Sequence, residues 1–240
     1  MILYVNGDSH SAAAEAVNEH SFADDDPAYK YQERRPHPAN VKASFGQVLA
    51  RIFKARLYMD AESASSNYRI LRTTKEWLTG PYLASVREEP LLLLGWTTWE
   101  REEWLHEGTY YQVNSSGIDW VPEELRERYK QWIVEYCTQW QVHQEKWHNI
   151  LWDFHCELKE QKIKHLFFNA FSSLDLIDPH KRHDWGDNYY SPYDSNLTYY
   201  NILKAKGFKT RGDREYGHYM SDAHEHFAQF IKFQLTKASR

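Results

Sequence analysis

Cysteine is scarce in this chain of 240 residues, and neither long apolar runs nor an excess of basic residues is present. The two cysteines, Cys137 and Cys156, are spaced neither as metal ligands nor as a redox pair, so we expect reduced thiols within a helical stretch. The longest aliphatic run, Leu91 to Leu94, is far too short to span a membrane, and no basic-plus-apolar leader opens the sequence. The net charge of −5 argues against nucleic-acid binding through a general basic field. The composition therefore predicts a soluble cytoplasmic protein without nucleic-acid or membrane partners.

Apolar runs alternate along the chain with helical stretches, as a parallel sheet with crossover helices requires. Strands are predicted at residues 2–6, 56–60, 91–95 and 164–169. Helices are predicted at residues 41–55, 66–79, 121–161, 196–206 and 220–236. Because no repeat or low-complexity tract divides the chain, residues 1–240 are expected to form one α/β domain.

A serine follows the first predicted strand at once, in the sequence Gly7-Asp8-Ser9-His10. A helix-forming, alanine-rich run at residues 12–17 comes next. A strand, a tight turn and a helix N-terminus together present a hydroxyl beside unpaired backbone N–H groups, which can hold an oxyanion. Ser9 is therefore the candidate nucleophile, and Asp8 is expected to shape the turn by accepting hydrogen bonds from backbone N–H groups.

A histidine near the other end of the chain is the candidate general base. Glu215 precedes His218 by three residues, a spacing that lets a carboxylate orient an imidazole within one turn. Asp213 is the alternative acid. Ser9, His218 and Glu215 are thus the predicted catalytic residues.

These residues resemble the conserved blocks of the SGNH (GDSL-like) hydrolase family. The family's first block is Gly-Asp-Ser after strand one, and its last is Asp-x-x-His near the C-terminus, with Glu215 standing here for the aspartate. The resemblance implies a three-layer α/β/α fold with a flavodoxin-like, doubly wound parallel sheet, a Ser-His-acid triad and no cofactor. It also implies that His218 is catalytic and His224 is not. Residues 66–70 and 96–101 look similar to a small variant encoded by tailed bacteriophages, which would place the protein in the cytoplasm of a bacterial host.

The two middle blocks depart from the family's pattern. In the family, a glycine after strand two and an asparagine after strand three supply donors to the oxyanion. Here no glycine follows the second predicted strand, so a backbone N–H of Ser65 or Ser66, or the amide of Asn67, is expected to donate. Gly95 matches the third block, and Thr97 takes the place of its asparagine. Losing one oxyanion donor costs about 3–4 kcal/mol, so modest activity or a substitute donor is expected.

The predicted reaction is hydrolysis of an ester, with acyl transfer to water. Polar and aromatic loops favour a sugar-bound acetyl group, so the preferred substrate class is that of a carbohydrate O-deacetylase. The alternative is a non-catalytic SGNH-like binding or structural protein, for example a glycan-binding phage component.

A metal-dependent hydrolase is the third hypothesis, with His224 and His226, or His180 and His183, as ligands. Metal-binding pairs on helices usually lie four residues apart, and His224 and His226 would point apart, so no metal is expected. The aromatic and aliphatic side of the helix predicted at 121–161 is expected to pack on the core, with a homodimer surface or a helical lid as the alternatives.

Overall fold

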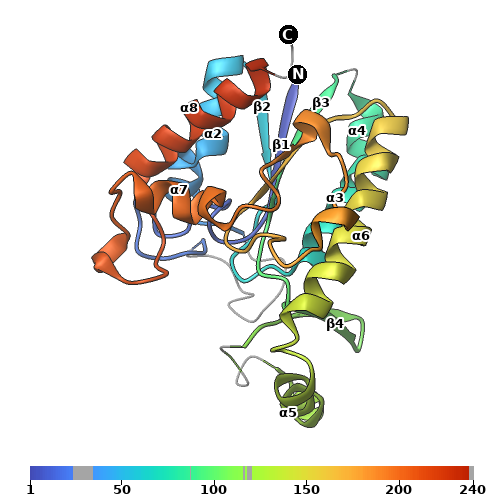
Figure 1. Ribbon diagram of the computed structural model, residues 1–240. Helices are drawn as coiled ribbons and strands as arrows, with labels where there is room; N and C mark the ends of the chain where they lie inside the picture. Colours follow the sequence, from blue (N-terminus) through green and yellow to red (C-terminus); the bar gives the residue numbers. More distant parts are fainter. Residues whose placement is uncertain (24–34, 87, 116, 118–120, 238–240) are drawn as a thin grey trace.

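The computed structural model describes residues 1–23, 35–86, 88–115, 117 and 121–237 (Figure 1). Over these residues, no helix has both the length and the apolar content needed to cross a membrane.

Five parallel strands form the central sheet, in the order β2-β1-β3-β6-β7. They are β1 Ile2–Asn6, β2 Arg56–Met59, β3 Pro90–Trp96, β6 Lys164–Asn169 and β7 Tyr189–Tyr190. The three central strands are buried over most of their length, and each contains an apolar run of at least three residues, as burial on both faces requires. All four predicted strands are confirmed, and β7 is an addition at the sheet edge.

Helices cover both faces of this sheet, which gives three layers (Figure 1). One face carries α1 Pro38–Ala43, α2 Phe45–Phe53, α7 Tyr199–Ala205 and α8 Ser221–Lys237. The other carries α3 Asn67–Thr79, α4 Pro81–Ser85 and α6 Trp140–Glu160. Leu3 and Val5 pack toward α2 and α8, whereas Ile2 and Tyr4 pack toward α3 and α6, as the two-residue period of a strand requires. The structure is therefore an α/β fold with a five-stranded, all-parallel sheet.

Two of the predicted helices are divided. The one predicted at 41–55 consists of α1 and α2, because the Ser44 hydroxyl accepts the Gln47 N–H and caps a new helix start. The one predicted at 121–161 consists of α5 Arg126–Glu135 and α6. Cys137 lies in the turn between them, Cys156 lies within α6, and both are free thiols. Short 3-10 turns complete the helical structure at Glu123–Leu125, Pro179–Lys181, Gly186–Asn188, Ser195–Leu197 and Arg211–Asp213.

A two-stranded antiparallel hairpin, which the sequence pattern did not predict, follows β3. It consists of β4 Glu102–His106 and β5 Thr109–Val113. Glu107 and Gly108 both have positive φ (48° and 78°), the conformation that a tight two-residue hairpin turn requires. The hairpin and α5 share a small hydrophobic cluster that includes Trp104 and Trp132, at the lower end of the molecule in Figure 1.

Candidate functional site

The candidate site lies where the strand order reverses direction. From β1 the chain crosses to β2 on one side, and from β3 it crosses to β6 on the other. At such a switch point the loops after the two central strands diverge and leave a crevice that binds ligands in open α/β sheets. The turn after β1 carries Ser9, and the loop after β3 carries Thr97. The structure therefore confirms that these two predicted segments meet at one edge of the sheet.

Two glycines let the Ser9 turn approach β3 closely. Gly7 has φ of +155°, and a Cβ there would lie 2.6 Å from Ser11 Cβ and 2.9 Å from the Gly95 carbonyl oxygen. A Cβ on Gly95 would lie 2.5 Å from Ser11 Oγ and 2.7 Å from the Phe168 ring. Gly95, predicted to belong to the oxyanion block, is buried within β3 and provides space for Ser11.

Asp8 is buried, and its carboxylate holds the turn in place by accepting hydrogen bonds. One carboxylate oxygen accepts the His10 N–H (3.0 Å), as predicted, and the other accepts the Thr97 hydroxyl (2.7 Å) and lies 4.0 Å from Arg101 Nη1. Burial alone would raise the pKa of Asp8, but the electrostatic interactions with His10 and Arg101 and these hydrogen bonds outweigh it. The pKa of this carboxyl is therefore below its usual value, and Asp8 carries a negative charge at neutral pH.

Thr97 and Asn67 bind each other instead of facing an open crevice. Asn67 Oδ1 accepts the Thr97 N–H (2.9 Å), and its Nδ2 lies 3.4 Å from the carbonyl oxygens of Thr97 and Thr98. With its hydroxyl donated to Asp8, Thr97 has both of its donors engaged. Asn67 thus fixes the loop after β3 at the start of α3.

The remaining predicted oxyanion donors also have internal partners. The Ser65 N–H donates to the Glu62 carbonyl, and the Ser66 N–H donates to the side chain of Gln112 on the hairpin. The Ser66 hydroxyl caps α3 by accepting the Arg69 N–H. Ser65, Ser66, Asn67 and Thr97 are therefore close to the Ser9 turn, but they support it structurally.

Two other donors lie near Ser9. Its own N–H has no hydrogen-bond partner among the residues with described placement. Arg101, which donates to the Ser65 carbonyl (3.2 Å), provides a partly exposed guanidinium beside Asp8. The sequence contained Arg101 in the third block but offered no signal for this role.

The carboxylate that faces His218 belongs to Glu15. The run predicted as a helix at residues 12–17 consists of turns, because Ala13 and Glu15 adopt left-handed φ values of 55° and 60°. Such values are costly for residues with a side chain and are retained where the surroundings enforce them. The chain thereby folds back, and Glu15 Oε2 lies 3.5 Å from His218 Nδ1.

Two arginines dock the segment that contains His218 onto the segment that contains Glu15. Arg211 donates to the carbonyl oxygens of Glu15 (2.6 Å) and Val17 (2.8 Å), and Arg214 forms an ion pair with the Glu15 carboxylate. The contact with His218 and the charge of Arg214 lower the pKa of Glu15, although burial opposes this. Glu15 is therefore ionised and held on both sides by donors.

The two acids predicted to orient His218 lie elsewhere. Glu215 is exposed, and within the described ranges it forms no hydrogen bond or ion pair with His218. Asp213 is also exposed and pairs with Lys209 (3.2 Å). The structure thus places Glu15, and neither predicted acid, beside the imidazole.

A second histidine, His10, connects the Ser9 turn to His218. Its ring lies 5.4 Å from the His218 ring and stacks at 5.5 Å on Phe171, so it is enclosed by aromatic side chains. Burial lowers the pKa of His10 to about 4, and the charge of His218 adds to the effect. His10 is therefore neutral at physiological pH. Ser9 is partly exposed, and its hydroxyl forms no hydrogen bond with another described side chain.

The histidines of the metal hypothesis, all of which the structure describes, do not form a cluster. His224 is buried in the core between Phe45 and Tyr199, in agreement with the expected non-catalytic role. Among the residues that the structure describes, no group of three or more His, Cys, Asp or Glu side chains is arranged to hold a metal ion.

Comparisons with protein-family models, curated proteins and solved structures gave no match.

A cavity of about 330 Å³ lies beside the site, next to the loop that follows β6. Phe171, which packs on His10, lines it together with Trp99 and the half-exposed Trp140. Ser172, Ser173 and Gln144 provide polar groups on its wall. A ligand in this cavity would contact the same phenylalanine that encloses His10.

Proposed function

We propose that this chain is a serine ester hydrolase of the SGNH type, with Ser9 as nucleophile, His218 as general base and Glu15 as the acid that orients the imidazole. The contact between Glu15 and His218, at the sheet edge that carries the Ser9 turn, supports this proposal most strongly. Counting only the strands of the sheet, their order is 2-1-3-4-5, the order of flavodoxin-like, doubly wound folds. The order is in keeping with the SGNH hydrolase fold that the sequence resembles.

The orientation of His218 assigns a role to each ring nitrogen. Nδ1 faces the Glu15 carboxylate, so Nε2 is the nitrogen that removes the proton from Ser9. The serine oxygen attacks the ester carbonyl, and His218 then protonates the departing alcohol. Water, activated by the same imidazole, releases the acid and restores Ser9. Glu15 stabilises the imidazolium that forms in each half-reaction.

The tetrahedral intermediate carries a negative charge that the protein must stabilise. Because Ser65, Ser66, Asn67 and Thr97 donate internally, the Ser9 N–H and the Arg101 guanidinium are the donors that we assign to the oxyanion. A guanidinium in this place supplies the charge that the family's asparagine amide does not. Arg101 would therefore stabilise the oxyanion in place of the family's asparagine, so that ester hydrolysis does not require that asparagine.

The neighbouring aromatic cavity favours an acetylated carbohydrate as substrate. Trp99, Trp140 and Phe171 offer apolar ring faces, and the serine and glutamine side chains offer hydrogen bonds. Sugars present both an apolar ring face and hydroxyl groups, which suits such a mixed wall. Acetylated carbohydrates are therefore the substrate class that we propose, and O-deacetylation is the reaction.

The alternative is a binding protein without turnover. It is favoured by the internal use of the donors predicted at Ser65, Ser66, Asn67 and Thr97, and by the absence of a hydrogen bond on the Ser9 hydroxyl in the described structure.

A fluorophosphonate distinguishes the two functions, because it reacts only with an activated serine. We expect intact-mass measurement to show one adduct on the wild-type protein and none on Ser9→Ala or His218→Ala. Ser85→Ala, which removes an exposed hydroxyl on α4, is the matched control and should label like the wild type. If folded wild-type protein forms no adduct, the hydrolase proposal is wrong and the binding function is the better account.

A further inference from the structure

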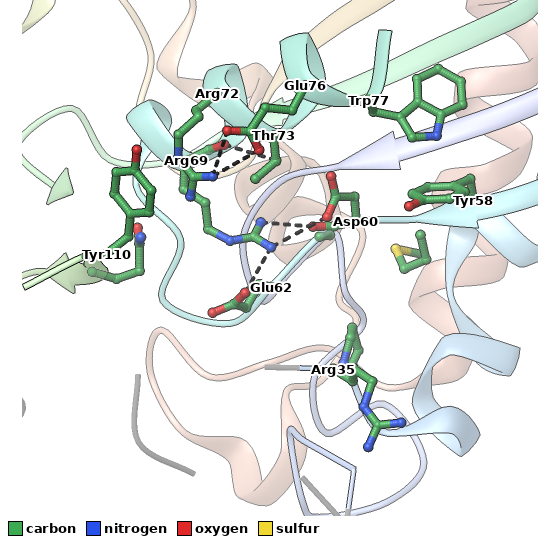
Figure 2. A pocket seen from close by; sticks show the side chains of 15 residues that line it. Arg35, Tyr58, Asp60, Glu62, Arg69, Arg72, Thr73, Glu76, Trp77 and Tyr110 are labelled. Carbon is green, nitrogen blue, oxygen red and sulfur yellow. Dashed lines mark hydrogen bonds and ion pairs between the residues drawn. The ribbon is translucent and has the colours of Figure 1, made fainter. Parts of the chain in front are cut away.

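A larger cavity, of about 420 Å³, lies at the carboxyl end of β2, between α3 and the hairpin. Its lining includes Tyr58, Asp60, Arg69, Arg72, Glu76 and Tyr110, and Figure 2 shows these side chains around it. Ser9, Glu15 and His218 are not among the described residues that line it. The cavity is therefore a second candidate site, with a volume within the roughly 300–1,000 Å³ of small-molecule pockets.

Three arginines line this cavity, and two of them, Arg69 and Arg72, are paired with carboxylates. Arg69 lies 2.9 Å from Glu62 and 3.5 Å from Asp60, and it also donates to the Asp60 carbonyl (2.9 Å). Arg72 makes two hydrogen bonds to Glu103 (2.8 and 2.9 Å) and contacts Glu76. The lining also contains three acids, Asp60, Glu62 and Glu76, which balance the three arginines, so the wall has no excess positive charge to attract an anion.

The acids still have the capacity to accept hydrogen bonds from a ligand. A carboxylate has about four lone-pair positions, and the Glu76 side chain is 60% exposed. Asp60 accepts the Tyr4 hydroxyl on one oxygen and is itself partly exposed. Hydrogen bonds from hydroxyl groups to such ionised acceptors are short and strong. The middle of the cavity is therefore suited to a ligand with several O–H donors.

Aromatic rings stand on both sides of this polar middle (Figure 2). Tyr58 is 37% exposed and packs on Trp77, with ring centroids 5.5 Å apart. On the opposite side stands Tyr110 of the hairpin, with the Arg72 guanidinium 3.9 Å from its ring centroid. Exposed ring faces bind the apolar faces of ligand rings. A wholly apolar ligand, in contrast, would displace water from the charged wall without replacing its hydrogen bonds, which is unfavourable.

From this combination we infer that the cavity binds a neutral carbohydrate. Its hydroxyl groups would donate to Asp60 and Glu76, and its apolar ring faces would pack on Tyr58 and on Tyr110. A phosphate or uronate would meet carboxylates whose arginine partners are already occupied. This inference does not rest on the proposed esterase activity, because the cavity and the Ser9 site have separate linings.

The test is a binding titration with neutral disaccharides at millimolar concentration. Cellobiose, maltose, lactose and N,N′-diacetylchitobiose serve as probes in saturation-transfer NMR, with glucuronate and glucose 6-phosphate as anionic comparisons. We expect at least one neutral disaccharide to bind, and both anions to bind more weakly. Ser9→Ala should bind the sugar like the wild type, which separates this inference from the esterase proposal.

Two consecutive residues of β5 provide a matched pair of variants. Tyr110 lines the cavity, whereas Tyr111, which pairs with Trp104, points to the other face of the hairpin. Tyr110→Ala should weaken binding about tenfold, the loss expected for about 1.4 kcal/mol of contact, and Tyr111→Ala should not. Tyr58→Ala provides a second reading on a different element should the hairpin variant fail to fold.

Three results would overturn the inference. They are the absence of binding by every neutral disaccharide, stronger binding of either anion, and unchanged binding in folded Tyr110→Ala or Tyr58→Ala protein.

Discussion

Glu15 and His218 are separated by most of the chain, yet Glu15 Oε2 lies 3.5 Å from His218 Nδ1. Their approach depends on a left-handed residue, since Glu15 has φ of 60° where its sequence favours a helix. The backbone cost of about 1–2 kcal/mol is offset by two arginines that bind the same segment. A costly conformation that presents a carboxylate to a histidine is characteristic of a functional site.

Replacing this carboxylate should separate the two candidate acids. In Glu15→Gln the imidazolium loses its counter-charge, so we expect kcat/KM for p-nitrophenyl acetate to fall by about a hundredfold or more. Glu215→Gln is the matched control and should stay within about twofold of the wild type, because Glu215 is exposed and makes no contact with His218 among the described residues. The reverse ranking of the two variants would return Glu215 to the catalytic site.

The central strands were predictable because burial on both faces requires apolar runs in the sequence. Leu91 to Leu94, for example, can form only a buried strand or a buried helix segment, and its short length selects the strand. The hairpin was missed because Glu102 and Glu103 are polar and its only deeply buried position in β4 is Trp104. Its buried side chains form a separate small cluster with residues of α5. Because that cluster joins segments that are apart in the sequence, the alternation of residues along one strand does not reveal it.

The candidate site was predictable only in part, for a different reason. Ser9 follows a strand directly, so local sequence was enough to place it. Glu15 lies in an alanine-rich run whose helical propensity is overridden by tertiary contacts with Arg211 and Arg214. The acid that faces His218 is therefore determined by contacts between residues far apart in the chain, and no local spacing of acids and histidines in the sequence predicts it.

Removing the Thr97 hydroxyl should destabilise the site through Asp8. Thr97→Val keeps the shape of the side chain but leaves a buried carboxylate without its shortest hydrogen bond. We expect the free energy of unfolding in urea to fall by about 1–3 kcal/mol and the pKa of Asp8 to rise. Thr79→Val removes an exposed hydroxyl that bonds to the Lys75 carbonyl, and should cost no more than about 0.5 kcal/mol. Equal losses in the two variants would contradict the role given to Thr97.

Gly7 should tolerate no side chain. In Gly7→Ala the new Cβ meets Ser11 and the Gly95 carbonyl oxygen in a buried turn, so we expect a loss of about 3 kcal/mol or more in unfolding free energy. Gly207 also has a positive φ, of 80°, but no atom lies within 4 Å of its ideal Cβ. Gly207→Ala should therefore lose only about 1 kcal/mol, the conformational cost alone. Chemical denaturation of both variants measures the difference, and a cost for Gly7→Ala no greater than that of the control would show that the turn can relax.

Buried histidines should make the protein less stable as the pH falls below neutral. Burial lowers the pKa of His10 and His165 to about 4 and that of His224 to about 3, whereas in the unfolded chain each titrates near 6.5. Between these values the unfolded state binds protons that the folded state does not, so their contribution is fully present above about pH 6.5 and is lost as the pH falls toward 4. Each such histidine adds about 1.4 kcal/mol per pH unit to the slope of unfolding free energy against pH.

Urea denaturation at pH 7, 6 and 5 should show this slope. His224→Gln should reduce the slope by the contribution of one proton, about 1.4 kcal/mol per pH unit, whatever its effect on stability at pH 7. A stability that stays constant from pH 7 to 5 would mean that these imidazoles take up protons in the folded protein and are not held neutral by burial.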